Sequence, residues 1–238
     1  MWIFLLLLNT ASAAILEELL LRKRRRHWRV EGLRVGVVVP EYTRHGLDLL
    51  SKQAHHEDIV LLGGSDYPNY WNVVHTLSHT YGMPKAKSLT GGYDWLYDNG
   101  YDILCNLDPD VLVKPNWLSE SVNLVQMYPD SVISAFNSKN LDCVNETFAT
   151  HYFKCCGTGI HYCFTRNTYV EIRHVFLEED WNTALEEHMR SIGHFFVSTK
   201  PSLIQHVGFD SDFAPDYILS EAEIDLIRHI PQLDTLWN

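Results

Sequence analysis

The chain has 238 residues, of which 46% are hydrophobic, and a formal net charge of −11. This length suits one domain with a short appendage, and the apolar content is sufficient for a core. The charge is uneven: residues 22–29 carry six basic side chains, whereas from Gly32 onward 27 acidic residues outnumber 13 basic ones, a net charge of −14. Such an acidic body repels polyanions, which argues against nucleic acid as a partner.

A hydrophobic and basic leader over residues 1–31 precedes this body. Its apolar run is shorter than the ~20 residues that span a bilayer, and it contains Ala11-Ser12-Ala13, which resembles a signal-peptidase site. The basic cluster that follows would hold the downstream domain on the cytoplasmic side of a membrane. A cleaved signal, a marginal anchor and a membrane-surface helix remain open. We expect membrane association, through the secretory pathway if the leader is a signal or an anchor.

Strands and helices alternate in the first half of residues 32–211, the predicted globular domain. This order favours an α/β fold with a mostly parallel central sheet flanked by helices. The predicted strands cover residues 33–39, 59–62, 103–107, 132–135, 195–197 and 203–206, and a glycine-broken strand pair covers 155–165. The predicted helices cover 46–53, 69–81, 91–99, 117–127, 167–176 and 178–192. A helical tail over 212–238 includes a helix at 220–229 that starts at a capping box.

The five cysteines bear on the cellular compartment, because their spacing matches no zinc site. Cys143 can form a disulfide with Cys155 or Cys156 if the domain is lumenal, and free buried thiols are the alternative. The triplet Asn145-Glu146-Thr147 is an acceptor sequence for N-glycosylation, although such triplets often arise by chance.

The most informative stretch is a predicted strand, residues 103–107, that ends in Asp108-Pro109-Asp110. Residues two apart in an extended chain point to the same side. Both acids can therefore converge on one hard divalent cation, which prefers oxygen ligands. Open α/β folds place their ligands at the carboxyl ends of the strands. The stretch thus predicts a metal site that binds a diphosphate. A similar pair of acids occurs in Asp210-Ser211-Asp212, but no predicted buried strand precedes it.

The order of these motifs resembles glycosyltransferases of the GT-A fold, especially the family 2-like members of the nucleotide-diphospho-sugar transferase superfamily. The similarity covers about residues 33–208. It implies a single Rossmann-like domain, Mn²⁺ or Mg²⁺ as cofactor, and a nucleotide-sugar donor that is UDP- or GDP-linked. The acceptor that it implies is a glycan, a protein or a lipid.

The resemblance also assigns the residues that contact the nucleotide. The loop after the first strand, which holds Pro40, Tyr42 and Arg44, is the part that touches the nucleotide in such enzymes. Their second strand normally ends in an acid that reads the base. Gly63-Gly64 stands there in this chain, and the nearest acid is Asp66, so the choice of nucleotide stays open.

For the metal and the chemistry, the resemblance implies that Asp108 lies near the ribose or a metal-bound water. Asp110 and His206 are then metal ligands. In the acidic stretch at the start of the predicted helix 178–192, Asp180 corresponds to the catalytic base of inverting members, and Glu179 is its nearest rival.

Two further features belong to the same resemblance. The glycine-containing turn Gly157-Thr158-Gly159 would lie beneath the donor sugar, where a close backbone approach needs no Cβ. A simple β-bulge is the alternative for this turn. Trp181 and Tyr152 can each stack on a sugar ring or pack in the core.

We therefore expect metal-dependent transfer of a sugar to an acceptor hydroxyl, with inversion. A nucleotidyltransferase that makes a sugar nucleotide is one alternative, but its glycine-rich basic loop is missing after the first strand. A non-catalytic, membrane-associated binding module of the same fold is another. A metal-dependent hydrolase built on His55-His56-Glu57-Asp58 is a weaker one, because that cluster lies in a polar loop before a strand.

Overall fold

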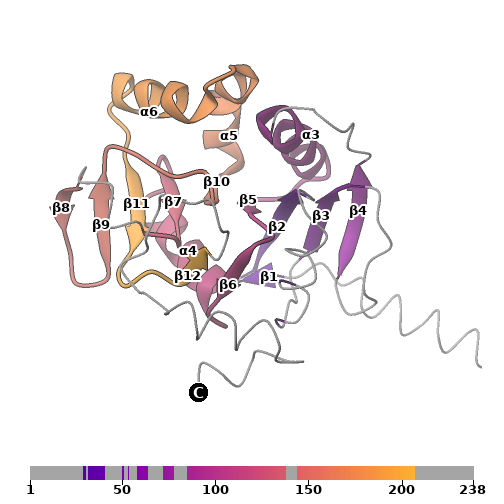
Figure 1. The fold of residues 1–238 in the computed structure, drawn as a ribbon, viewed down its shortest axis with the longest axis horizontal. Coiled ribbons are helices and arrows are strands. Elements are labelled where there is room, and N and C mark those ends of the chain that lie inside the picture. Colours follow the sequence, from indigo (N-terminus) through magenta and orange to yellow (C-terminus); the bar gives the residue numbers. More distant parts are fainter. Residues whose placement is uncertain are drawn as a thin grey trace, which may run out of the picture.

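The computed structural model describes residues 29–30, 32–40, 50, 53, 58–63, 72–77, 85–137 and 144–206. These residues form one large sheet, one two-stranded sheet and several helices (Figure 1). The strands are β1 (Arg29–Val30), β2 (Leu33–Pro40), β3 (Asp58–Leu62), β4 (Val73–Leu77), β5 (Ile103–Leu107), β6 (Val111–Val113), β7 (Val132–Ser134), β8 (Val144–Thr147), β9 (His151–Lys154), β10 (His161–Thr165), β11 (Phe196–Thr199) and β12 (Ile204–His206). The helices are α3 (Lys85–Asp98), α4 (Trp117–Met127), α5 (Arg166–Ile172), α6 (Trp181–Ser191) and the 3-10 helix η1 (Arg173–Leu177).

The large sheet has the order β4-β3-β2-β5-β10-β7-β11-β9-β8, and β1 pairs with β2. Strands β4, β3, β2 and β5 are parallel, so their carboxyl ends meet at one edge of the sheet. Strand β10 enters antiparallel between β5 and β7, and β7 is parallel to β11. The expected α/β fold with a mostly parallel central sheet is therefore confirmed.

Helices cover both faces of this sheet, because its central strands are apolar on both sides. All residues of β3 and β5 are buried, which is typical of parallel strands packed between two layers. Helix α4 packs on one face through Trp117 and Val122. Helices α3, α5, η1 and α6 pack on the other face through side chains such as Tyr93, Phe176 and Leu185 (Figure 1).

Several predicted elements differ from the structure. The predicted helix 69–81 is wrong, because its described part is strand β4. The apolar residues of this segment fit a helical spacing, but the segment pairs in parallel with β3 from Val73 to Leu77, and this tertiary contact decides the conformation. The predicted strand pair 155–165 contains one strand, β10, which pairs with β5 and β7 instead. Strands β1, β6, β8 and β9 were not predicted.

The remaining differences lie at element ends. Helix α3 begins at Lys85 rather than residue 91, and the predicted helix 167–176 is divided between α5 and η1. Only Leu50 and Gln53 of the predicted helix 46–53 are described. Of the leader, only Arg29 and Val30 are described, as strand β1, and its other residues lie outside the described residues, as does the predicted helix 220–229.

Two observations on the described residues bear on the cellular compartment. Among them, no helix is both long enough and apolar enough to cross a bilayer. Cys156 is disulfide-bonded, whereas Cys105, Cys155 and Cys163 are free. Cys143, the fifth cysteine of the sequence, lies outside the described residues. The expected disulfide therefore involves Cys156 rather than Cys155.

His161 in β10 is a completely buried histidine. Its Nδ1 accepts a hydrogen bond from the Ala135 N–H at 2.9 Å, and its ring lies edge-on to Trp117 with 5.3 Å between ring centroids. Burial lowers the pKa of His161 from 6.5 to about 3, because a charged imidazolium would lose its hydration there. The folded protein thus keeps this ring neutral.

This burial predicts a loss of stability in acid. Between pH 6.5 and about 3, unfolded His161 binds a proton that the folded state rejects, so stability falls as the pH falls through this window. From pH 7 to pH 5 the wild-type protein should lose about 2 kcal/mol more of its free energy of unfolding than the His161→Phe variant. Urea unfolding at both pH values measures this difference. The exposed His174→Phe should behave like wild type, and equal losses in wild type and His161→Phe would contradict the prediction.

Candidate active site

The two acids predicted to bind a metal lie where β5 ends. Asp108 directly follows β5, and its backbone N–H donates to the Ile160 carbonyl at 3.0 Å. The chain then turns at Pro109 and Asp110 and continues as β6. Asp108 is buried, whereas the side chain of Asp110 is 34% exposed. One acid is therefore held by the sheet, and the other faces solvent beside it.

The two-stranded sheet brings His206 to the same place. Strand β12 pairs antiparallel with β6, and His206 stands opposite Val111, the residue after Asp110. Gln53 supports the other edge of β6: its side chain donates to the Val111 carbonyl at 2.8 Å and accepts from the Val113 N–H at 2.6 Å. The pairing of β12 with β6 therefore holds the His206 imidazole beside the Asp110 carboxylate.

Asp108, Asp110 and His206 form a group that can hold a divalent cation. One donor atom from each lies within 4.8 Å of the others, and His206 Nε2 is 3.2 Å from Asp110 Oδ2. Neighbouring ligands of an octahedral ion with bonds of about 2.1 Å lie about 3 Å apart, and opposite ligands about 4.2 Å. Small side-chain rotations bring the group to these values. Carboxylates suit Mg²⁺ and Mn²⁺, and the imidazole favours a transition metal.

A buried asparagine ties this acidic end of β5 to the neighbouring loop. Asn106 Oδ1 accepts from the Tyr93 hydroxyl and from the Tyr162 N–H, both at 2.9 Å. Its Nδ2 donates to the carbonyls of Gly159 at 3.0 Å and Ile160 at 3.4 Å. The turn before β10 is therefore fixed beside the two acids.

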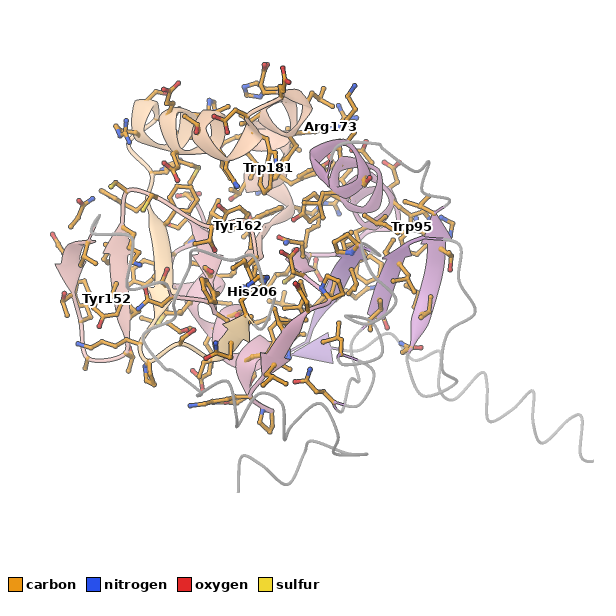
Figure 2. All side chains as sticks on the ribbon, in the orientation of Figure 1. Trp95, Tyr152, Tyr162, Arg173, Trp181 and His206 are labelled. Atoms are coloured by element: carbon orange, nitrogen blue, oxygen red, sulfur yellow. The ribbon has the colours of Figure 1, made fainter. Side chains whose placement is uncertain are left out.

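Helix α6 lies against the same turn. Trp181, Leu185 and Met189 recur every four residues and form its buried stripe. The flank beside this stripe reaches the turn: Glu186 Oε1 accepts from the Gly157 N–H at 3.2 Å, and Asn182 Oδ1 accepts from the Tyr162 hydroxyl at 3.4 Å. Figure 2 shows Tyr162 between Trp181 and His206 in the view, and the Tyr162 and Trp181 rings are 6.0 Å apart.

Two ionisable groups in this region have shifted pKa values. Burial raises the pKa of the Glu186 carboxyl, and nearby Asp180 raises it further, whereas the Gly157 N–H and Arg190 lower it. Burial also raises the pKa of Tyr162, with additional contributions from the charges of Glu186 and Asp108. The Tyr162 phenol therefore stays neutral. Tyr162 connects α6 with β5, because its hydroxyl donates to Asn182 of α6 and its backbone N–H donates to Asn106 of β5.

The other predicted residues divide into three groups. Pro40 ends β2 at the same sheet edge as Asp108, because Val38 pairs with Asn106. Asp180 and Glu179 are exposed at the start of α6, outside the Asp108 group. The remaining predicted nucleotide contacts lie outside the described residues; they are Tyr42, Arg44 and Asp66.

The sequence also held signals that the prediction did not use. Asn106 is a polar residue inside an otherwise apolar buried strand, two positions before Asp108, and buried amides need hydrogen-bond partners. Asn182 and Glu186 are four residues apart and so share one face of α6. This spacing indicates the face of α6 that contacts the turn at Gly157–Gly159.

Comparison with known proteins supports the fold assignment. No protein-family profile and no curated protein sequence matches the chain. The crystal structure of GalNAc-T7 with UDP, GalNAc and Mn²⁺ matches with a TM-score of 0.55 and 12% identity, over 73% of this chain and 44% of that one. A structure from Desulfovibrio desulfuricans G20, named as a nucleotide-diphospho-sugar transferase, matches with a TM-score of 0.44 and 14% identity, over 69% and 78%.

The chain therefore has a GT-A-like fold, as its motifs implied. It spans less than half the length of the GalNAc-T7 chain, 44%. At 12% identity the match shows the architecture alone.

Gly159 provides a test of how closely α6 packs on the turn. Its φ is +73°, and an added Cβ would lie 2.8 Å from the Trp181 ring and 2.9 Å from Asn182 Oδ1. Gly193 has a similar φ of +75° but nothing within 4 Å. We expect Gly193→Ala to cost about 1–2 kcal/mol from backbone strain alone. Gly159→Ala should cost more, because Trp181 must also move. Urea unfolding measures both, and equal losses would show that the turn and α6 are not in tight contact.

Proposed function

We propose that this chain is a metal-dependent glycosyltransferase that moves a sugar from a nucleoside-diphosphate donor to an acceptor hydroxyl. The observation that carries this proposal is the convergence of Asp108, Asp110 and His206 at the sheet edge of a GT-A-like fold. The presence of UDP and Mn²⁺ in the GalNAc-T7 structure supports the same donor and cofactor class for this chain.

On the donor side, the proposed roles are those that the resemblance to GT-A glycosyltransferases implies. Asp108, Asp110 and His206 hold Mn²⁺ or Mg²⁺, and Asp108 also faces the ribose. A bound divalent cation acts as a Lewis acid that neutralises the leaving diphosphate. The loop after β2 contacts the nucleotide through Pro40, Tyr42 and Arg44, with Asp66 as the nearest acid for the base. The turn Gly157-Thr158-Gly159 supports the sugar, and its two glycines leave room for Tyr162 and Trp181 to pack closely against it.

On the acceptor side, a carboxylate must take the proton of the attacking hydroxyl. We assign this role to Asp180, an exposed acid at the start of α6, with Glu179 as its nearest rival. One base that assists a single displacement at the anomeric carbon gives inversion. Glu186 has a different role, because its Oε1 already accepts a hydrogen bond from Gly157 and so holds the sugar-supporting turn in place.

We also propose that the protein is membrane-associated and that its folded domain lies in an oxidising compartment. The apolar leader supports the first part. The disulfide at Cys156 supports the second, because such bonds persist in the secretory pathway and outside the cell. This orientation is opposite to the one that the basic cluster after the apolar run favours.

The metal site predicts a defined change in Mn²⁺ affinity. Loss of an outer-shell partner costs 10–100-fold in metal affinity, so loss of a direct ligand in Asp110→Asn should weaken Mn²⁺ binding by more than about 100-fold. His206→Gln should also weaken it. Isothermal titration calorimetry with Mn²⁺ alone measures these affinities. Asp130→Asn, at an exposed position away from the group, is the control, and wild-type affinity in Asp110→Asn would refute the site.

Turnover tests the proposed reaction. With Mn²⁺, a panel of UDP- and GDP-sugars should show release of one nucleoside diphosphate, and a chelator should stop it. Asp180→Asn should lower the rate of transfer to an acceptor about 10²–10⁴-fold, as expected for a general base. Glu187→Gln, an exposed acid on the same helix, should retain activity. NMR of the product anomer tests inversion.

The outcomes of this assay separate the alternatives. Release of pyrophosphate from a nucleoside triphosphate would identify a nucleotidyltransferase. Donor and metal binding without turnover, over a broad set of donors and acceptors, would identify a binding module.

A further inference from the structure

The triplet Asn145-Glu146-Thr147 lies at an exposed end of the fold. It is the only Asn-x-Ser/Thr triplet in the 238-residue sequence. It occupies β8, the last strand in the order of the large sheet among the described residues, and every residue of this strand is exposed. An exposed edge strand presents both its backbone and its side chains to another molecule.

A bulge in this strand makes Asn145 the accessible residue. Val144 pairs with Lys154, and Glu146 pairs with the next residue, Phe153. Asn145 is therefore the extra residue, without an opposite partner in the ladder. Bulges redirect side chains and weaken local pairing, so the carboxamide of Asn145 can be presented to an enzyme without disrupting the core.

The chemistry of the neighbouring segment points to a compartment where N-glycosylation occurs. Cys156, two residues after β9, is disulfide-bonded, and disulfides form in the same oxidising compartments where Asn-x-Thr triplets are glycosylated. The leader contains Ala11-Ser12-Ala13, a signal-peptidase-like sequence. These observations are independent of the triplet itself.

Exposed apolar side chains flank the triplet. Val144 is 43% exposed and Phe148 is 41% exposed. The Phe148 ring stacks on His151 and meets the edge of Phe153. Apolar groups at an open sheet edge promote aggregation. A bulky, soluble attachment at Asn145 would cover them.

We propose that Asn145 carries an N-linked glycan. A host transferase would supply the oligosaccharide from a lipid-diphosphate donor. The bond that forms joins Asn145 Nδ2 to C1 of the first sugar, and the bond that breaks joins C1 to the diphosphate oxygen. The amide nitrogen loses one proton, and the lipid diphosphate leaves with the electron pair.

This site is separate from the candidate active site. Thr147 pairs with Tyr152 of β9, and Figure 2 shows Tyr152 far from His206, at the β8 and β9 end of the sheet. The proposal is therefore independent of the proposed sugar transfer, and loss of the glycan should leave metal binding unchanged.

The test is expression of the full chain, with its own leader, in eukaryotic cells that have a secretory pathway. A peptide-N-glycosidase should produce one mobility shift on gel electrophoresis, and mass spectrometry should find an aspartate in place of Asn145 in the treated peptide. Asn145→Gln and Thr147→Ala should each abolish the shift. Glu146→Gln, at the variable position, should retain it.

Two results would contradict a glycan at Asn145. A glycosidase-sensitive shift that survives Asn145→Gln would overturn the assignment. A folded full chain without a glycan would also overturn it, whether Cys156 is oxidised or reduced.

Discussion

The carboxamide of Asn106 is the contact on which the geometry of the candidate site depends. It is completely buried, and it bonds the Tyr93 hydroxyl, the Tyr162 N–H and the carbonyls of Gly159 and Ile160. A buried polar group that loses its partner costs about 1–3 kcal/mol. These partners therefore hold one another, and β5, α3 and the turn before β10 are fixed together. Asp108 lies two residues after Asn106, so the same contacts also hold its backbone in place.

Contacts between residues that are distant in the sequence place the rest of the site around Asn106. Helix α6 rests on the same turn through Asn182 and Glu186, so the proposed acceptor side keeps its position relative to β5. The pairing of β12 with β6 brings His206 to the site, although His206 is far from Asp108 in the sequence. The entropic cost of closing a long loop grows only slowly with its length. Three backbone pairings and the Gln53 side chain are thus enough to hold the imidazole there.

Elements that local sequence determines were predicted correctly, whereas elements that depend on distant contacts were not. Continuous apolar runs predicted β2, β3 and β5 well, because a strand buried on both faces needs no partner to be identified in sequence. Helix α4 was predicted with its exact bounds, since Pro115 and a helical spacing of apolar residues mark it locally. Strand β4 was missed because its pairing with β3, not its own pattern, decides its conformation. The proposed ligand role of His206 came only from the family resemblance, because no local sequence pattern predicts the pairing of β6 with β12.

The charge of the domain explains why the proposed reaction requires a cation at this position. From Gly32 onward the chain carries a net charge of −14, and the candidate site itself contributes Asp108 and Asp110. A nucleoside-diphosphate sugar is also anionic, so the domain repels its own proposed donor at long range. Within the site the repulsion is stronger, because Asp108 is buried and poorly screened by solvent. A divalent cation held by Asp108 and Asp110 would cancel the charge of these two carboxylates and so remove the local repulsion. Under the proposed function, donor affinity therefore depends on the ion first and on contacts to the sugar second.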